Sequence, residues 1–178
     1  MELWDLYDLD RNKTGRTIVR GEPIPEGYYR FVVHICIFDN AGRMLIQHRT
    51  PTKRAFPDVW DLSAGGAAIQ GDDSHSAAQR ELYEELGIAY DFSAIRPVLT
   101  TCFANGFNDV YCITLDGLDL ASLTLQERET DGVRWATEDE ILALIDEGDF
   151  IPYHKGYLSY LFHRRNHTNV HINIHEDK

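Results

Sequence analysis

Basic residues are scarce in this sequence. The chain of 178 residues has 17 lysines and arginines against 29 aspartates and glutamates, which gives a formal net charge of -12 at pH 7. Such a chain has no general attraction for phosphate backbones or for anionic lipid surfaces, so we expect neither a nucleic-acid polymer nor a membrane as partner. An anionic ligand would have to be bound by a local group of cations.

Cysteines and long apolar runs are also few. Cys36, Cys102 and Cys112 are odd in number, lie in separate apolar runs and form no CxxC pair, which favours reduced thiols in the core over a disulfide framework. No stretch reaches the roughly 18 apolar residues of a membrane span, and the first residues lack the order of a signal peptide. We therefore expect a cytoplasmic protein.

The composition is that of one folded domain with a short extension. Hydrophobic residues make up 43% of the chain and charged residues 26%, with no low-complexity segment, which argues against intrinsic disorder. Residues 3–7 and 16–19 are extended patches around a polar stretch, which predicts an N-terminal hairpin. The segment 21–27 holds two prolines and two glycines and ends this unit. We divide the chain into a hairpin extension, residues 1–27, and a main domain, residues 28–178.

The main domain alternates between strand patterns and helix patterns. Residues 28–38 and 43–49 are rich in β-branched and aromatic residues around turn letters, which predicts a hairpin. Beyond them we expect a small-residue loop at 63–71, a helix at 74–86, strands at 95–104 and 110–115 around a turn at 105–109, a short strand at 133–135, helices at 138–146 and 153–167, and an alternating tail at 170–178. This order predicts an α+β fold with a mixed sheet.

One of these predicted helices carries three clustered carboxylates. Glu81, Glu84 and Glu85 are spaced i, i+3 and i+4, so they share one helix face, and Arg80 can offset only part of their repulsion. Mg²⁺ prefers carboxylate oxygens and completes its shell with phosphate oxygens of a substrate. Hydrolysis of a phosphoanhydride by metal-activated water is therefore one hypothesis, and an ordinary solvated acidic helix face is the other.

The surrounding pattern decides between these two interpretations, because residues 66–88 resemble the Nudix box. In words, that box is Gly, five residues, Glu, seven residues, Arg-Glu, an aliphatic residue, any residue, Glu-Glu, any residue, Gly and an aliphatic residue. The matching positions are Gly66, Arg80, Glu81, Leu82, Glu84, Glu85, Gly87 and Ile88. The single departure is Asp72, which stands where the box has Glu. The chain is identified as a member of the Nudix family over about residues 28–145.

Membership implies a fold, an activity and a cofactor. The implied fold is the Nudix α/β/α sandwich, in which a mixed curved sheet lies between helices. The implied activity is cleavage of a nucleoside diphosphate linked to another group, or of a related small organic diphosphate, with Mg²⁺ or Mn²⁺ as cofactor. The resemblance leaves the oligomeric state open, with a homodimer as one possibility because dimers are frequent in the family.

The resemblance also assigns roles to residues of the box. Glu84 and Glu85 would be metal ligands, Glu81 a ligand or the base that acts on water, and the Gly66 carbonyl a further ligand. Arg80 would anchor the carboxylates by ion pairing.

The same comparison singles out four more positions. Asp72 would hold a metal-bound water or orient the box arginine, with a reach shortened by one methylene. Many family members take a further carboxylate from a later loop, for which Glu127 and Glu129 are the candidates and Glu129 the preferred one. An ordinary exposed acidic loop is an equal alternative for both. Ile69 stands where many members have an additional acid.

Candidates for substrate phosphates come from the end of the second core strand and the loop after it. Arg49, Lys53 and Arg54 form a local basic group in an acidic chain, and such cations bind phosphate oxygens. The alternative is an exposed basic loop without a ligand.

Two other functions stay open at this point. Isopentenyl diphosphate isomerase has a similar loop, a related box and a similar N-terminal extension, but its chemistry needs a cysteine and a histidine where this chain has Gly65 and Ala67. A Nudix-like binding module without catalysis would be expected to lose box carboxylates, and all three remain. Both observations favour a hydrolase.

Overall fold

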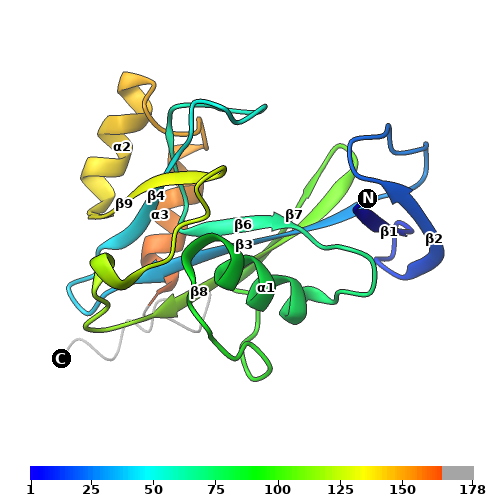
Figure 1. Ribbon diagram of the computed structural model, residues 1–178, viewed down its shortest axis with the longest axis horizontal. Coiled ribbons are helices and arrows are strands. Elements are labelled where there is room, and N and C mark those ends of the chain that lie inside the picture. The colour runs from blue at the N-terminus through cyan, green and yellow to red at the C-terminus, as the bar shows by residue number, and fades with distance from the viewer. Residues whose placement is uncertain (166–178) are drawn as a thin grey trace, which may run out of the picture.

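The computed structural model describes residues 1–165, in which two sheets and three α-helices are present. Strands β1 (Leu3–Tyr7) and β2 (Lys13–Val19) form an antiparallel hairpin at one end of the molecule (Figure 1). The predicted N-terminal hairpin is thus confirmed, with a second strand that begins at Lys13 rather than at residue 16. The predicted tail at 170–178, and the end of the predicted C-terminal helix, lie outside the described residues.

The main sheet is mixed and has seven strands. They are β3 (Arg30–Phe38), β4 (Met44–Arg49), β5 (Trp60–Asp61), β6 (Ala64–Ala67), β7 (Leu99–Phe103), β8 (Gly106–Thr114) and β9 (Thr130–Ala136). Strand β3 pairs antiparallel with β6 and parallel with β8, whereas β4 pairs antiparallel with β5 and β9. This mixed sheet with helices confirms the predicted α+β fold.

The predicted hairpin of residues 28–38 and 43–49 is wrong beyond its turn. Strands β3 and β4 share a single residue pair, Phe38 with Met44. From there they diverge, because β3 takes β6 and β8 as neighbours while β4 takes β9 along its whole length. Sequence alternation predicts a strand but not its partner, since the pairing is decided by segments far away in the chain. The sheet therefore splits into two branches.

Helix α1 (Ser74–Leu86) has the predicted bounds and lies on one face of the sheet. Its buried residues include Leu82 and Leu86, which pack in one core cluster with β3. The side chain of Asp73 accepts a hydrogen bond from the Ser76 amide at the first turn, and Gly87 ends the helix with a φ of 71°. Both signals are readable from the sequence, because a side-chain cap and a left-handed glycine are local requirements.

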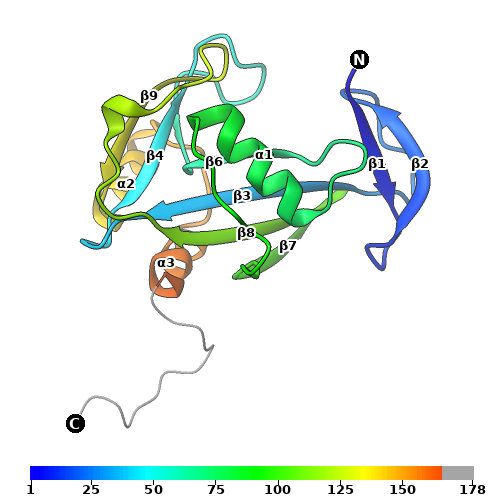
Figure 2. The same cartoon turned by 60° about the horizontal axis from the view of Figure 1, so that its bottom comes forward.

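The other helices belong to the second layer. Helix α3 (Lys155–Arg164) lies on the face opposite α1, and it packs with α2 (Glu138–Glu147) in a second core cluster (Figure 2). A short 3-10 helix, η1 (Leu120–Ser122), precedes β9. None of the helices in residues 1–165 combines the length and hydropathy that a bilayer crossing demands.

Two predicted loops contain strand residues instead. Ala64–Ala67 of the small-residue loop forms β6, where a side chain at Gly65 would lie 2.6 Å from the His34 ring. The predicted turn at 105–109 is shorter, since Phe107 and Asp109 are buried within β8. Asp109 is polar but accepts hydrogen bonds from other elements, which makes its burial possible and hides the strand pattern.

The cysteine prediction is right in one case and wrong in another. Cys36 is fully buried in the core, Cys112 is half-buried and Cys102 is exposed. Cys102 lies on β7, whose burial alternates along the strand, so an apolar run in the sequence does not fix which face a residue occupies.

The N-terminal hairpin is attached to the loop that precedes α1. The Leu3 carbonyl accepts a hydrogen bond from the Gln70 amide at 2.8 Å, and the Asp5 carboxylate accepts one from the Gly71 amide at 2.9 Å. Trp4 of the hairpin packs in a small buried cluster against which Ala67 lies. The extension therefore forms one side of the region where the box residues lie.

Candidate active site

The three box glutamates line one pocket. We call it the acidic pocket; its volume is about 150 Å³, and its lining includes Arg20, Lys53, Gly66, Arg80, Glu81, Glu84, Glu85 and Glu129. These residues come from the N-terminal hairpin, the loop after β4, strand β6, helix α1 and the turn before β9. The pocket thus lies where the two branches of the sheet separate.

Gly66 lies directly beneath one carboxylate. A Cβ atom at this position would stand 2.4 Å from the carboxylate carbon of Glu81, so a side chain here would push that carboxylate out of its place. The adjacent Gly65 amide donates a hydrogen bond to Oε2 of Glu85 at 3.0 Å. Strand β6 therefore lies against the carboxylate ends of Glu81 and Glu85, and the missing side chain at Gly66 leaves the Glu81 carboxylate in its place.

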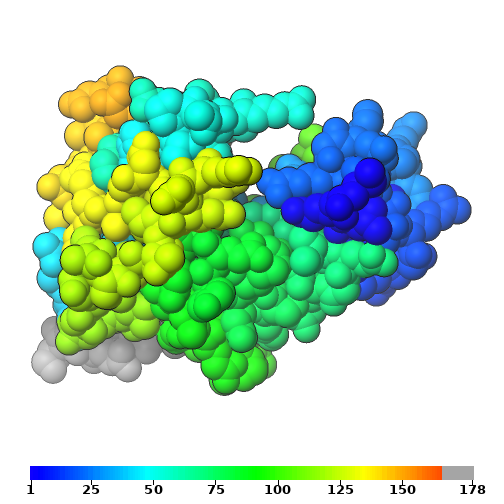
Figure 3. Space-filling view, in the orientation of Figure 1, coloured from blue at the N-terminus to red at the C-terminus, as the bar shows by residue number. Residues whose placement is uncertain are grey.

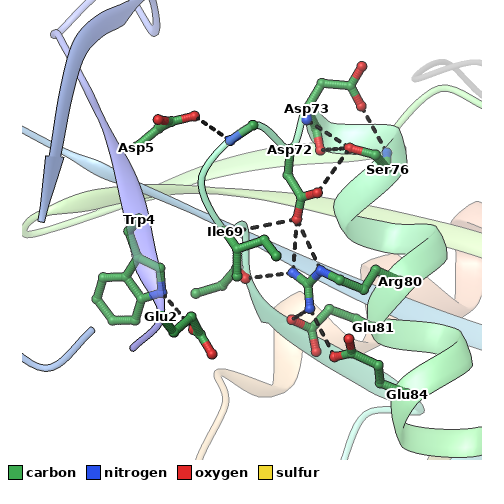
Figure 4. A network of polar contacts seen from close by, with 12 residues as sticks. Glu2, Trp4, Asp5, Ile69, Asp72, Asp73, Ser76, Arg80, Glu81 and Glu84 are labelled. Atoms are coloured by element: carbon green, nitrogen blue, oxygen red, sulfur yellow. Dashed lines mark hydrogen bonds and ion pairs between the residues drawn. The ribbon is translucent and has the colours of Figure 1, made fainter. Parts of the chain in front are cut away.

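Arg80 is the centre of a hydrogen-bond network (Figure 4). Its Nη1 donates to Oε1 of Glu81 at 2.8 Å and to Oε2 of Glu84 at 3.0 Å. Its Nε and Nη2 donate to Oδ2 of Asp72 at 3.1 and 2.9 Å, and Nη2 also donates to the Ala67 carbonyl at 3.0 Å. Burial acts to lower the pKa of Arg80, but the neighbouring carboxylates raise it above its usual value. The guanidinium therefore stays charged and fixes two box glutamates.

Glu85 is the most buried of the three box glutamates. Its side chain belongs to a residue only 6% exposed, and Oε2 accepts hydrogen bonds from Nε2 of Gln47 and from the Gly65 amide, both at 3.0 Å. Burial, followed by the charge of Glu81, raises the pKa of Glu85 to about 7. Burial also raises the pKa of Glu81. Both carboxylates would be stabilised in their charged form by a nearby cation.

The donor set fits a hard divalent cation. Within residues 1–165 no three acidic, histidine or cysteine side chains already converge as a metal site, because Arg80 draws Glu81 and Glu84 toward itself. Each box glutamate nevertheless has one oxygen that accepts no hydrogen bond from residues 1–165, namely Oε2 of Glu81, Oε1 of Glu84 and Oε1 of Glu85. A set of carboxylate oxygens suits Mg²⁺ or Mn²⁺ better than a thiophilic metal.

Because Glu85 is buried, replacing its carboxylate with an amide should stabilise the metal-free protein, by an amount that depends on pH. In the metal-free protein in EDTA at pH 8, Glu85→Gln is expected to raise the free energy of unfolding by about 1–3 kcal/mol. Because the folded pKa is raised to about 7 from the usual 4.5, the folded protein binds this proton more tightly than the unfolded chain does. The cost of ionisation is absent below the unfolded pKa, grows between the two values and is complete above the folded one.

Urea denaturation of both proteins at pH 5 and pH 8 measures this effect. Glutamine can still accept the hydrogen bonds from Gln47 and Gly65, so the gain should be small at pH 5 and full at pH 8. Glu147→Gln on α2, an exposed position, is the matched control and should show no gain at either pH. A gain of equal size at both pH values would contradict the assignment to Glu85.

The structure separates the two candidates for the further carboxylate, Glu127 and Glu129, by their position relative to the acidic pocket. Glu129 lines the acidic pocket and forms an ion pair with Lys53, whereas Glu127 is exposed and does not line it. Burial, followed by the charge of Arg49, lowers the pKa of Lys53. The structure thus brings Glu129 and Lys53 together with the box residues.

Of the two arginines predicted to bind substrate phosphates, Arg49 is already bound to groups of the protein itself. Its guanidinium donates to Oδ2 of Asp61 at 3.0 Å and to the carbonyls of Ala55 and Phe56 at 2.8 and 2.9 Å. It therefore holds the loop after β4 in place. Arg54, in that loop, is exposed and lies near the acidic pocket without lining it.

Sequence reasoning did not single out Arg20 or Gln47. Arg20 follows β2 and lines the acidic pocket, and Gln47 on β4 contacts Glu85. No local pattern marks either residue, because each reaches the site only after the hairpin docks on residues 70–71 and the sheet assembles. The box spacing covers residues 66–88 alone.

The comparisons agree with this geometry. A family model described as NUDIX domain matches residues 28–156. The chain belongs to the Nudix family. A Nudix hydrolase of Listeria monocytogenes is 44% identical over 172 residues, which is 97% of this chain and 100% of that protein. Nudix hydrolase 3 of Arabidopsis thaliana is 34% identical over 166 residues, which cover 85% of this chain and 22% of that protein.

A solved structure extends the similarity to the fold. The crystal structure of a Deinococcus radiodurans protein superposes with a TM-score of 0.70 at 27% identity, and the match covers 93% of this chain and 100% of that one. The Nudix fold is therefore shown for this chain. The Nudix relatives are named as hydrolases, which supports a hydrolytic activity for the family member described here.

Proposed function

We propose that this protein is a divalent-metal-dependent pyrophosphohydrolase. Its substrate would be a nucleoside diphosphate linked to another group, or a related small organic diphosphate. The observation that supports this most directly is that Glu81, Glu84, Glu85 and Gly66 line one pocket, and that each carboxylate has an oxygen that accepts no hydrogen bond from residues 1–165. A folding role alone does not require three like charges in one place.

Four residues of the acidic pocket would hold the divalent cation. Gly66, Glu81, Glu84 and Glu85 would hold the Mg²⁺ or Mn²⁺. When bound, the cation supplies positive charge that activates water and offsets charge on phosphate oxygens.

In the proposed reaction a phosphoryl group passes from the bridging anhydride oxygen to water. Water attacks phosphorus, the anhydride P–O bond breaks, and the electron pair leaves with the departing phosphate oxygen. Glu81 or Glu129 would accept the proton of the attacking water. Lys53, which lies beside Glu129, would pair with phosphate oxygens, and Arg80 keeps the carboxylates in position.

A substrate panel tests the proposed function. Nucleoside triphosphates, nucleoside diphosphate sugars, dinucleoside polyphosphates, coenzymes and isopentenyl diphosphate are incubated with Mg²⁺ or Mn²⁺, and the products are separated by chromatography. We expect metal-dependent cleavage of at least one compound by the wild type and by Glu147→Gln, and cleavage slowed by about three orders of magnitude by Glu85→Gln. Isomerised isopentenyl diphosphate, or a ligand bound intact without any cleavage, would instead support one of the two alternatives.

Asp72 is expected to act through Arg80. Asp72→Asn should lower kcat/KM by about 10- to 100-fold, the usual effect of losing a group that orients a ligand, because an amide brings no negative charge to the oxygen that accepts from both Nε and Nη2 of Arg80. Asp72→Glu restores the residue usual in the box and should keep most of the activity. Steady-state kinetics on the best panel substrate measures both, and an unimpaired Asp72→Asn enzyme would show that Arg80 needs no such partner.

A further inference from the structure

A second hollow adjoins the acidic pocket, and cations dominate its lining. We call it the basic hollow; its volume is about 300 Å³, and its charged lining residues are Arg20, Arg49, Lys53, Arg54, Arg128 and Glu129. Arg20, Lys53 and Glu129 also line the acidic pocket, so the two spaces share one wall. In a chain with a formal charge of -12, five of the 17 basic residues gather here.

Figure 3 shows the setting of this space. The loop after β4 projects outward at the top of the view, above the segment before β9 and beside the N-terminal hairpin, with a hollow between them. The hairpin is held in this place by its hydrogen bonds to Gln70 and Gly71. Arg20 thus stands at the junction of the two spaces because of the docked extension.

Three of the five cations already have acidic partners. These are Arg20 with Glu2 at 3.0 Å, Lys53 with Glu129, and Arg49 with Asp61 at 3.0 Å. Arg54 and Arg128 are exposed, and neither forms an ion pair within residues 1–165. Two positive charges are therefore left uncompensated, which is about the charge of one phosphate monoester at neutral pH.

The chemistry of the lining suits phosphate rather than a nucleobase. No aromatic residue of the described chain lines the basic hollow, so it lacks a ring face on which a base could stack. Guanidinium groups bind phosphate oxygens through paired, charge-assisted hydrogen bonds. Thr52, a further lining residue, adds a hydroxyl.

We propose that the basic hollow binds an additional phosphate of the substrate. The molecule cleaved would then carry at least one phosphate beyond the diphosphate that lies against the box glutamates. This inference rests on the proposed function and names its substrate class. The additional phosphate is either the next member of a phosphate chain or a monoester on the linked group, since both present the same oxygens to Arg54 and Arg128.

Matched substrate pairs test the proposal. Coenzyme A and 3′-dephospho-coenzyme A differ by one monoester, and ATP and ADP differ by one chain phosphate. The wild type is expected to favour the phosphate-rich member of one pair by about tenfold or more in kcat/KM, and the pair concerned identifies the source of the phosphate. Arg128→Gln and Arg54→Gln should reduce that preference toward one, whereas the exposed control Arg96→Gln should keep it.

A binding measurement separates this proposal from the proposed function. Calorimetric titration of inorganic tripolyphosphate in EDTA needs neither metal nor hydrolysis. We expect binding to the wild type and to Arg96→Gln, weakened about tenfold in Arg128→Gln, with circular dichroism confirming that each variant folds. Equal binding by all variants, or equal kcat/KM within both substrate pairs, would overturn the proposal. If no compound of the panel is cleaved, only the proposed hydrolase function is refuted. The titration still shows whether the basic hollow binds phosphate.

Discussion

Glu85→Gln is expected to lower kcat/KM for the best diphosphate substrate by about 10³-fold, which corresponds to about 4 kcal/mol of transition-state stabilisation. Glu85 lies deepest in the acidic pocket, and one of its oxygens is free of hydrogen bonds from residues 1–165. An amide at this position keeps the shape and the contacts to Gln47 and Gly65 but brings no negative charge. The loss should therefore be one of chemistry and metal affinity rather than of folding.

The test is steady-state hydrolysis across a range of Mg²⁺ concentrations, with Glu147→Gln as control. Loss of a metal ligand should raise the Mg²⁺ concentration needed for half-maximal activity as well as lower the rate. Together with the expected gain in metal-free stability, this result would show that Glu85 is retained for function at the expense of the fold. A Glu85→Gln enzyme with wild-type kinetics and metal dependence would remove Glu85 from the reaction.

Arg80→Met should produce the second large effect, this time on folding and activity together. In the metal-free protein at pH 8 we expect a loss of about 3 kcal/mol in the free energy of unfolding, because Glu81, Glu84 and Asp72 lose their shared partner in a partly buried site. The activity should fall about 100-fold, since the glutamates are no longer held in position. Methionine keeps the apolar stem, so the lost charge and hydrogen bonds cause the effect.

Urea denaturation with and without Mg²⁺ measures the folding effect. We expect Mg²⁺ to restore part of the lost stability, because a bound cation replaces positive charge beside the same carboxylates. Arg80→Lys keeps the positive charge but should still be less active than the wild type. An ammonium group cannot reproduce contacts to both Asp72 and the box glutamates. The exposed Arg96→Met is the control; a loss of equal size there would assign the effect to net charge instead.

The local part of the site could be predicted from the sequence. Helix α1 has the predicted bounds, and its three glutamates and Arg80 do lie together. Helical periodicity sets the neighbours at i+3 and i+4, and caps at Asp73 and Gly87 set the ends, so these features need only nearby residues.

The non-local part of the site could not be predicted from the sequence. The divergence of β3 from β4, the approach of Glu129 to Lys53 and the placement of Arg20 beside the pocket all depend on segments that are distant in sequence.

The sequence by itself thus determined the box helix, its carboxylate cluster and the expected fold class, because spacing along a helix is a local property. Only the tertiary structure decided which cations stand beside that cluster and which are already paired. The physical reason is that strand pairing and hairpin docking bury shared surface between remote segments, and their register depends on all of those segments at once. The two spaces that meet at Arg20 and Lys53 are a product of that packing.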